Sequence, residues 1–185
     1  MGLAIESGTG NGKLWEINND NHGVVKAIVE VQEAHISHHD GLAYSVTVED
    51  AGPAAGEYTL YIQNTNSNLN LVLTTIRASN VDANVVWKIH NVTGTAAGTI
   101  LTPVNMNFES GNIAAANCRG GAGGVTGLTS GAVIHEWFGG PAYNSQIVEF
   151  NGALIFPYGE AIAVEFDAGT GGKVAVCAHF HFIGD

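Results

Sequence analysis

The feature that most constrains this chain is an alternation of apolar and polar side chains at every second residue. Segments 57–64, 70–79 and 84–92 show it, and Asn, Gly and Thr separate them. Such alternation places apolar side chains on one face of a β-strand, whereas a surface helix needs a period near 3.6. The chain has 25 glycines, which interrupt any longer helical pattern. The sequence therefore predicts an all-β protein.

Turn residues at short intervals favour a sandwich or barrel, and we predict an antiparallel jelly-roll-like β-sandwich. A Gly- and Ala-rich stretch, 108–130, is interpreted as a long functional or mobile loop. The predicted strands cover 24–32, 42–48, 57–64, 70–79, 84–92, 99–106, 131–138, 146–156, 160–167 and 173–183.

The last two predicted strands are interpreted as a core hairpin closed by the turn 168–172. Pairing Asp167 with Lys173 places Phe166 opposite Val174 and gathers the even-numbered apolar side chains on one face. A shift of one residue would expose that face.

The first residues differ from the rest, because 14–23 carries few apolar groups around Trp15. We interpret 1–23 as an extended N-terminal arm that binds outside its own sandwich, or else as a terminus with one small strand. Residues 24–185 are predicted to form the sandwich domain. That length is sufficient to bury a core.

The charge balance disfavours several partners. The chain has 6 basic and 17 acidic residues, for a formal net charge of −11. Since Lys and Arg supply most affinity for nucleic acid, we predict neither nucleic acid nor an anionic membrane as partner. The start lacks the features of a signal peptide, and no apolar run approaches the roughly 20 residues that span a bilayer. Charged residues are only 12% of the chain, which suits either extensive protein contacts or an ordinary uncharged β-surface.

Histidines offer the main alternative chemistry. His179 and His181 share a strand face with Cys177, as ligands do in metal-binding barrels of the cupin type, and Glu165 is a further candidate ligand. Equally, these side chains face outward or line a subunit interface. A second group comprises His35, His38 and His39 beside Asp40.

Catalytic patterns are weak. There is no Gly-x-Ser-x-Gly elbow, and Cys118 stands alone in the glycine-rich stretch. The two cysteines form no disulfide framework, and we expect a buried free thiol at Cys177. We therefore predict no enzyme, no catalytic residue, no cofactor and no metal site.

Aromatic side chains suggest a second binding function. Trp87 alternates with Val85 and Ile89 and is predicted to lie in the core. Trp137 is expected at a sheet edge or loop, where it would form a lectin-like sugar platform. Other candidates for such a platform are Trp15, Tyr143 and Tyr158.

Between about Ala27 and Ile183 the order of short motifs resembles the capsid decoration, or cement, proteins of tailed bacteriophages. This family consists of jelly-roll β-sandwich virion proteins. The motifs are Lys26–Ile28, Gly41–Tyr44, Tyr61–Asn64, Val92–Thr95, Pro103–Asn107, Leu128–Ile134 and Ile155–Ala163.

The resemblance implies a homotrimer, made in the host cytoplasm, that binds the major capsid protein on the outer surface of an icosahedral capsid. Several weak contacts in one rigid body would stabilise the shell by avidity. It implies no catalysis. A glycan-binding jelly-roll module of a virion and, less favoured, a cupin-like metal-binding protein are the alternatives.

Overall fold

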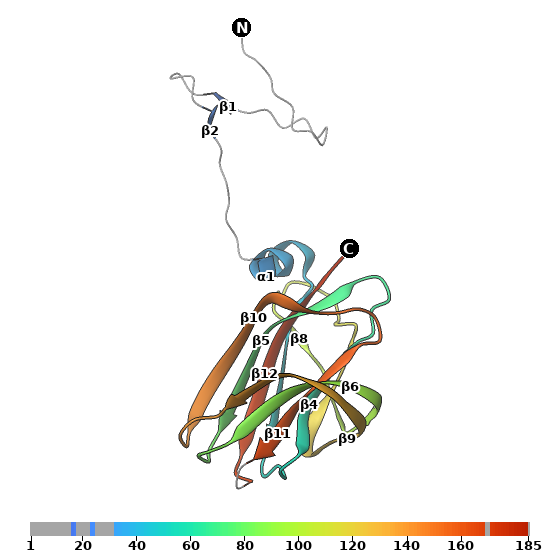
Figure 1. Cartoon of the computed structure of the whole chain (residues 1–185). Coiled ribbons are helices and arrows are strands. Elements are labelled where there is room, and N and C mark those ends of the chain that lie inside the picture. Colours follow the sequence, from blue (N-terminus) through green and yellow to red (C-terminus); the bar gives the residue numbers. More distant parts are fainter. Residues whose placement is uncertain (1–15, 18–22, 25–31, 169–170, 185) are drawn as a thin grey trace. The chain divides into compact units, whose positions relative to one another are not determined.

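The alternating segments fold into two antiparallel sheets of five strands each, which face each other across a shared core (Figure 1). The computed structural model describes residues 16–17, 23–24, 32–168 and 171–184. The chain divides into two units, Met1–Val31 and Gln32–Asp185. In the first unit, β1 (Glu16–Ile17) pairs antiparallel with β2 (Gly23–Val24). The second unit is nearly all-β, as the sequence predicts.

Both sheets lie in the second unit. Sheet I has the order β10 (Asn144–Phe156), β5 (Asn70–Asn80), β12 (Val174–Ile183), β3 (Ala43–Asp50) and β8 (Val104–Asn105). Sheet II has the order β4 (Glu57–Asn64), β11 (Ala161–Ala168), β6 (Val86–Ala97), β9 (Ala116–Phe138) and β7 (Thr99–Leu101).

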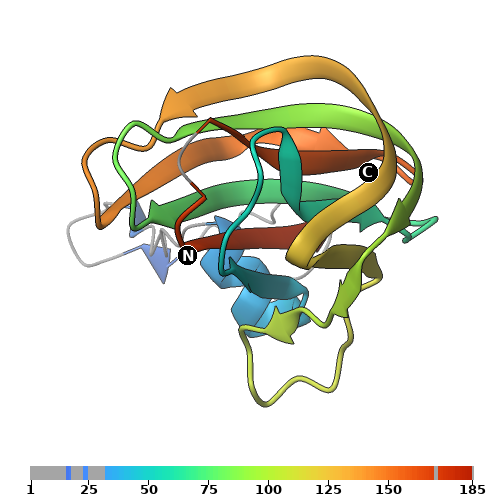
Figure 2. The ribbon, with the colours of Figure 1, turned by 90° about the horizontal axis from the view of Figure 1, so that it is seen from below.

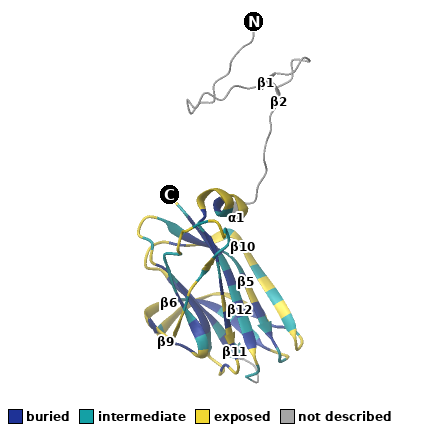
Figure 3. Cartoon of the chain, turned by 180° about the vertical axis from the view of Figure 1, so that it is seen from behind, coloured by how far each residue is buried: buried dark blue, intermediate teal, exposed yellow. Residues whose placement is uncertain are grey.

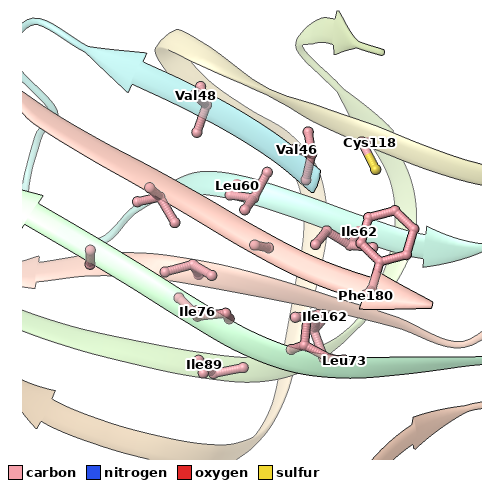
Figure 4. Close-up of a cluster of buried hydrophobic side chains, with 14 of the residues drawn as sticks. Val46, Val48, Leu60, Ile62, Leu73, Ile76, Ile89, Cys118, Ile162 and Phe180 are labelled. Carbon is pink, nitrogen blue, oxygen red and sulfur yellow. The ribbon is translucent and has the colours of Figure 1, made fainter. Parts of the chain in front are cut away.

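The core lies between the two sheets. Leu73 and Phe180 of sheet I meet Leu60, Ile89 and Ile162 of sheet II, and all five are fully buried (Figure 4). Burying such a side chain stabilises the fold by about 1.5–3 kcal/mol relative to leaving it in water. The apolar phase of the alternating segments is therefore the interior of the sandwich.

The predicted core hairpin is wrong, although its apolar face is right. Strand β11 pairs with β4 and β6 in sheet II, whereas β12 pairs with β3 and β5 in sheet I. Asp167 binds Lys88 at 2.9 Å, and Lys173 binds Glu49 at 2.7 Å. Alternation determines which face of a strand is buried but not which strand lies beside it, so the two strands face each other across the core.

The predicted loop 108–130 is also wrong over most of its length, because β9 begins at Ala116 and runs for 23 residues. Its first part pairs with β4 and β7, and its second part with β6. The strand bends sharply between them (Figure 2). Gly121 and Gly127 take φ values of 97° and 77°, which favour glycine. Glycine has no side chain to alternate, so a strand rich in it resembles a loop in sequence.

Two other boundaries differ from prediction. Pro103 cannot donate to a ladder, and the predicted strand 99–106 divides there into β7 and β8. Gln32, predicted to end a strand, begins helix α1 (Gln32–His35), which continues into the π-helical turn η1 (Ile36–Asp40). Val24 of that predicted strand lies in β2, and 25–31 lie outside the described residues.

Sheet II curls until β9 pairs with both β4 and β6. A second apolar cluster fills this curl, with Tyr61 from β4, Val92 from β6, Val125 from β9 and Ala163 from β11, each no more than 3% exposed. One flank of the sandwich is thereby closed by hydrogen bonds and packing.

Candidate protein-binding surface

The predicted metal ligands are not brought together. Glu165 lies in β11 of sheet II, and His179 and His181 lie in β12 of sheet I. Their even-numbered neighbours, such as Val164 and Phe180, fill the core between the sheets. Because successive side chains of a strand point to opposite faces, Glu165 and the two histidines point away from the shared core, on opposite sides of it.

The β12 residues differ in burial from the outward position predicted for them. His181 is 1% exposed, so that prediction is wrong for it, because η1 contacts this end of β12. His179 and Cys177 are half-buried. Hydrogen bonds from His179, then from Ser45 and Thr47, lower the pKa of the Cys177 thiol to about 7.

Both cysteines are free, and the more buried one is not the one expected. Cys118 is 1% exposed and lies in the core, where burial raises its pKa to about 12 (Figure 4). Its position in β9, rather than in a loop, explains the burial. A thiol with that pKa stays protonated and unreactive near neutrality.

Sequence reasoning missed a polar pair inside the curl of sheet II. His90 of β6 is 7% exposed, and its Nε2 forms an ion pair with Oε2 of Glu165. The ring of Tyr58 packs edge-on against His90, with 5.9 Å between centroids, and its hydroxyl hydrogen-bonds Ser130. Lys88 and His90 alternate with the core residues Trp87 and Ile89 along β6. This alternation is the sequence signal that could have predicted a polar face on this strand. The pair joins β6 to β11 and is accounted for by that structural role.

The other histidine group lies on one exposed helical segment. His35 and His39 have ring centroids 4.4 Å apart, and His38 and His39 4.5 Å apart. Across residues 34–167 and 171–184, no three His, Cys, Asp or Glu side chains are grouped so as to hold a metal ion.

Of the predictions for aromatic side chains, the one for Trp87 is confirmed and the one for Trp137 is wrong. Trp87 is fully buried, as predicted. Trp137 is only 8% exposed and stacks on Trp87 at 6.2 Å between ring centroids, so the predicted platform at Trp137 is wrong. It lies on the core face of β9, directly opposite Trp87 in the ladder. Tyr143 and Tyr158 are 86% and 65% exposed, and Trp15 lies outside the described residues.

In the part of the chain that the structure describes, every large exposed apolar side chain lies between Ile100 and Tyr158. Most of them form two groups. The "open flank" comprises Val133, Ile134, Phe138, Tyr143, Ile147 and Ile155, on β9, β10 and their connection. The "loop group" comprises Ile100, Val104, Phe108 and Ile113, on β7, β8 and the following loop. Large apolar side chains exposed on neighbouring segments make these elements the candidate surface for contact with other proteins.

The open flank includes a sheet edge. Among the described strands, β10 pairs with β5 alone, and its residues alternate between half-buried and exposed as far as Ile155, before the buried Phe156 (Figure 3). Edge strands are usually protected by Lys, by Pro or by a covering element. Strand β10 contains no Lys, Arg or Pro, and its one charged residue is Glu149. Asn151 and Gly152, both at positive φ, form a bulge that ends its regular part.

A hollow of about 290 Å³ adjoins the start of β10. Tyr143, Asn144 and Lys173 are among the residues that line it. Tyr143 takes a φ of 59°, which a bulky side chain rarely adopts. The connection between β9 and β10 thus holds an exposed aromatic ring beside a mainly apolar depression whose lining includes Asn80 and Asn144.

Comparison with protein-family models, with curated proteins and with solved structures gave no match for this chain. Of the helices in the described residues, none has the length and apolar character needed to cross a membrane.

Proposed function

We propose that the protein is a non-enzymatic structural component of a virion, which decorates an icosahedral phage capsid from outside by binding the major capsid protein. The observation that carries the proposal is that the large exposed apolar side chains lie on β7 to β10 and their connections, in the open flank and the loop group, with Tyr158 just after β10. Two separate apolar surfaces suit a protein that binds both its own copies and a different protein. The resemblance of its motifs to decoration proteins supplies the capsid as that second protein.

Charge supports the same location. A net charge of −11 repels packaged nucleic acid, so the outer face of a shell is the favourable side. Only 12% of the residues are charged, so fewer charged side chains have to lose water when the surface packs against a protein lattice than on a typical protein surface.

The finer architecture belongs to this proposal. We take the two sheets as a variant of the jelly roll, residues 1–23 as an extended arm, and the assembled form as a homotrimer. Three copies held together bind a lattice by avidity, so weak single contacts suffice.

Co-sedimentation with mature capsids tests the capsid contact. Phe108→Glu and Ile113→Glu alter side chains that are 90% and 84% exposed, so folding is unaffected while the loop group acquires charge. We expect capsid binding to fall at least tenfold and the oligomer to keep its size. Tyr158→Glu, outside both groups, is the matched control and should bind normally. The function would be refuted if the wild-type protein did not co-sediment with capsids of the phage whose genome encodes it.

Glycan binding is the second candidate, favoured by Tyr143 beside the hollow at the start of β10. A sugar ring stacks on an exposed aromatic face while amides such as Asn144 bind its hydroxyls. A glycan array should show binding that Tyr143→Ala removes and Tyr158→Ala retains.

A further inference from the structure

We propose that the free edge of β10 binds residues 26–31 of a second copy of this chain, which add to sheet I as an antiparallel strand. The inference deepens the proposed function, since it assigns the open flank to contacts between copies. The occupant is a segment outside the described residues, and its sequence, Lys-Ala-Ile-Val-Glu-Val, is the evidence for the match.

The receiving edge is the regular part of β10, residues 144–149, before the bulge. Its even-numbered side chains, such as Val148, are half-buried against the core, and its odd-numbered ones, Ile147 and Glu149, are exposed (Figure 3). An added strand therefore needs one apolar face that extends the core. Its other face meets an isoleucine and a carboxylate.

Residues 26–31 meet both requirements. Their odd-numbered side chains are all apolar, namely Ala27, Val29 and Val31, while the even-numbered ones are mixed. Antiparallel pairing with Lys26 opposite Glu149 places Ile28 opposite Ile147 on the outer face. The same register places Ala27 opposite Val148 on the core side.

In this register, opposite charges face each other across the two strands, in addition to apolar side chains. Glu149 is the only charge on β10, and Lys26 is the only basic residue of the added segment. Opposite charges on facing strands attract, whereas two β10 edges pairing with each other about a twofold axis near Glu149 would bring the two carboxylates together.

The distance between the two ends of sheet I assigns the added strand to another copy. Leu42, just after η1, accepts a hydrogen bond from Phe182, so Gln32 begins its helix at the end of sheet I where β12 finishes. Asn144 pairs with Asn80 at the opposite end, nine residues along β5 from Leu71, a separation of about 30 Å. Val31 is bonded to Gln32 and cannot lie beside Asn144 of its own chain. A donor in one copy and an acceptor in the next make a heterologous contact, which gives a ring when the rotation between copies closes and a filament when it does not.

A disulfide test distinguishes copies directly. Two full-length chains are co-expressed in a Cys177→Ser background, one tagged with Ile28→Cys and the other untagged with Ile147→Cys. The purified protein is oxidised with a glutathione redox buffer. With equal expression and random mixing we expect about half of the chains to form covalent heterodimers, because Ile28 and Ile147 lie opposite each other only between copies and only some junctions join one chain of each kind.

The matched control pairs Ile28→Cys with Ile113→Cys, whose side chain is more accessible than that of Ile147, at 84% against 49% exposed, but lies in the loop group. It should remain unlinked. Absence of the Ile28–Ile147 heterodimer in folded protein overturns the proposal, as does a disulfide that forms only when both cysteines are in one chain.

In a second test, Lys26→Glu should raise the concentration needed for assembly at least tenfold, and Glu149→Lys should restore it. Neither test uses capsids, so their failure is separable from failure of the proposed function.

Discussion

The two parts of β9 differ although they belong to one strand. Ala116–Val125 lies between β4 and β7 and contains buried residues such as Cys118. Thr126–Phe138 has β6 alone beside it among the described strands, and it carries Val133 and Phe138 at 48% and 69% exposure. The first part is glycine-rich and closes a flank, while the second exposes large apolar side chains at an edge. Exposure there follows from the missing neighbour, which the assembled particle supplies in our proposal.

The largest expected effect separates core from surface within the second part of β9. Trp137→Ala removes a buried ring stacked on Trp87 and should lower the free energy of unfolding by about 3–5 kcal/mol. Phe138→Ala, one residue later, should change it by less than about 0.5 kcal/mol. Urea unfolding measures both. Equal losses would mean that Phe138 is part of the core and the flank is not open.

The next effect tests the closed flank. A Cβ at Gly120 would lie 2.5 Å from the carbonyl oxygen of Thr59 and 2.9 Å from a Val48 methyl. Gly120→Ala should therefore destabilise the protein by about 2 kcal/mol through overpacking. Gly111→Ala has open space and is the control, with a change under about 0.5 kcal/mol. If Gly120→Ala is as stable as the control, glycine is not what permits the closure.

Much of the fold follows from the alternation. The segment 57–64 is strand β4 as predicted, and the buried faces of β11 and β12 are the predicted ones. The partners of β11 and β12 could not be predicted, because a side chain's burial is the same whether its strand pairs in one sheet or faces another across the core. Ala161 and Ala163 lie on the opposite face of β11 and are buried as well, because sheet II curls there.

The candidate surface was less accessible to sequence reasoning. Ile147 and Ile155 alternate with the half-buried side chains of β10 in the same way as core residues do, so only the strand order reveals that they are exposed at an edge. Trp137 lies in the predicted strand 131–138, which is part of β9, but the sequence does not show that its side chain lies on the core face of that strand. His90 and Glu165 lie 75 residues apart in sequence and meet only because β6 and β11 pair.

A smaller effect concerns the connection that follows the second part of β9. Tyr143 holds a left-handed φ of 59° with its ring 86% exposed. Tyr143→Gly should raise the free energy of unfolding by about 1 kcal/mol, since glycine adopts this conformation without steric strain. Thermal unfolding reports the gain, and binding assays should report a loss if the ring contacts a ligand. A destabilised variant would show that the ring packs against the protein and is not held out for a partner.

The smallest effect is kinetic and compares the thiol of the closed flank with that of sheet I. Cys177 has a pKa of about 7, so its reactive thiolate predominates above pH 7 and declines as the pH falls below it. Cys118 is buried and has a pKa of about 12, so it stays protonated over the same range. Alkylation by iodoacetamide should modify Cys177 with a rate midpoint near pH 7, and Cys118 only after denaturant is added. His179→Gln should move the midpoint upward, because His179 is the largest cause of the lowered pKa. Modification of Cys118 in native protein would show that the first part of β9 opens readily. The two parts of β9 would then differ in amino-acid composition but not in how firmly they are held in the fold.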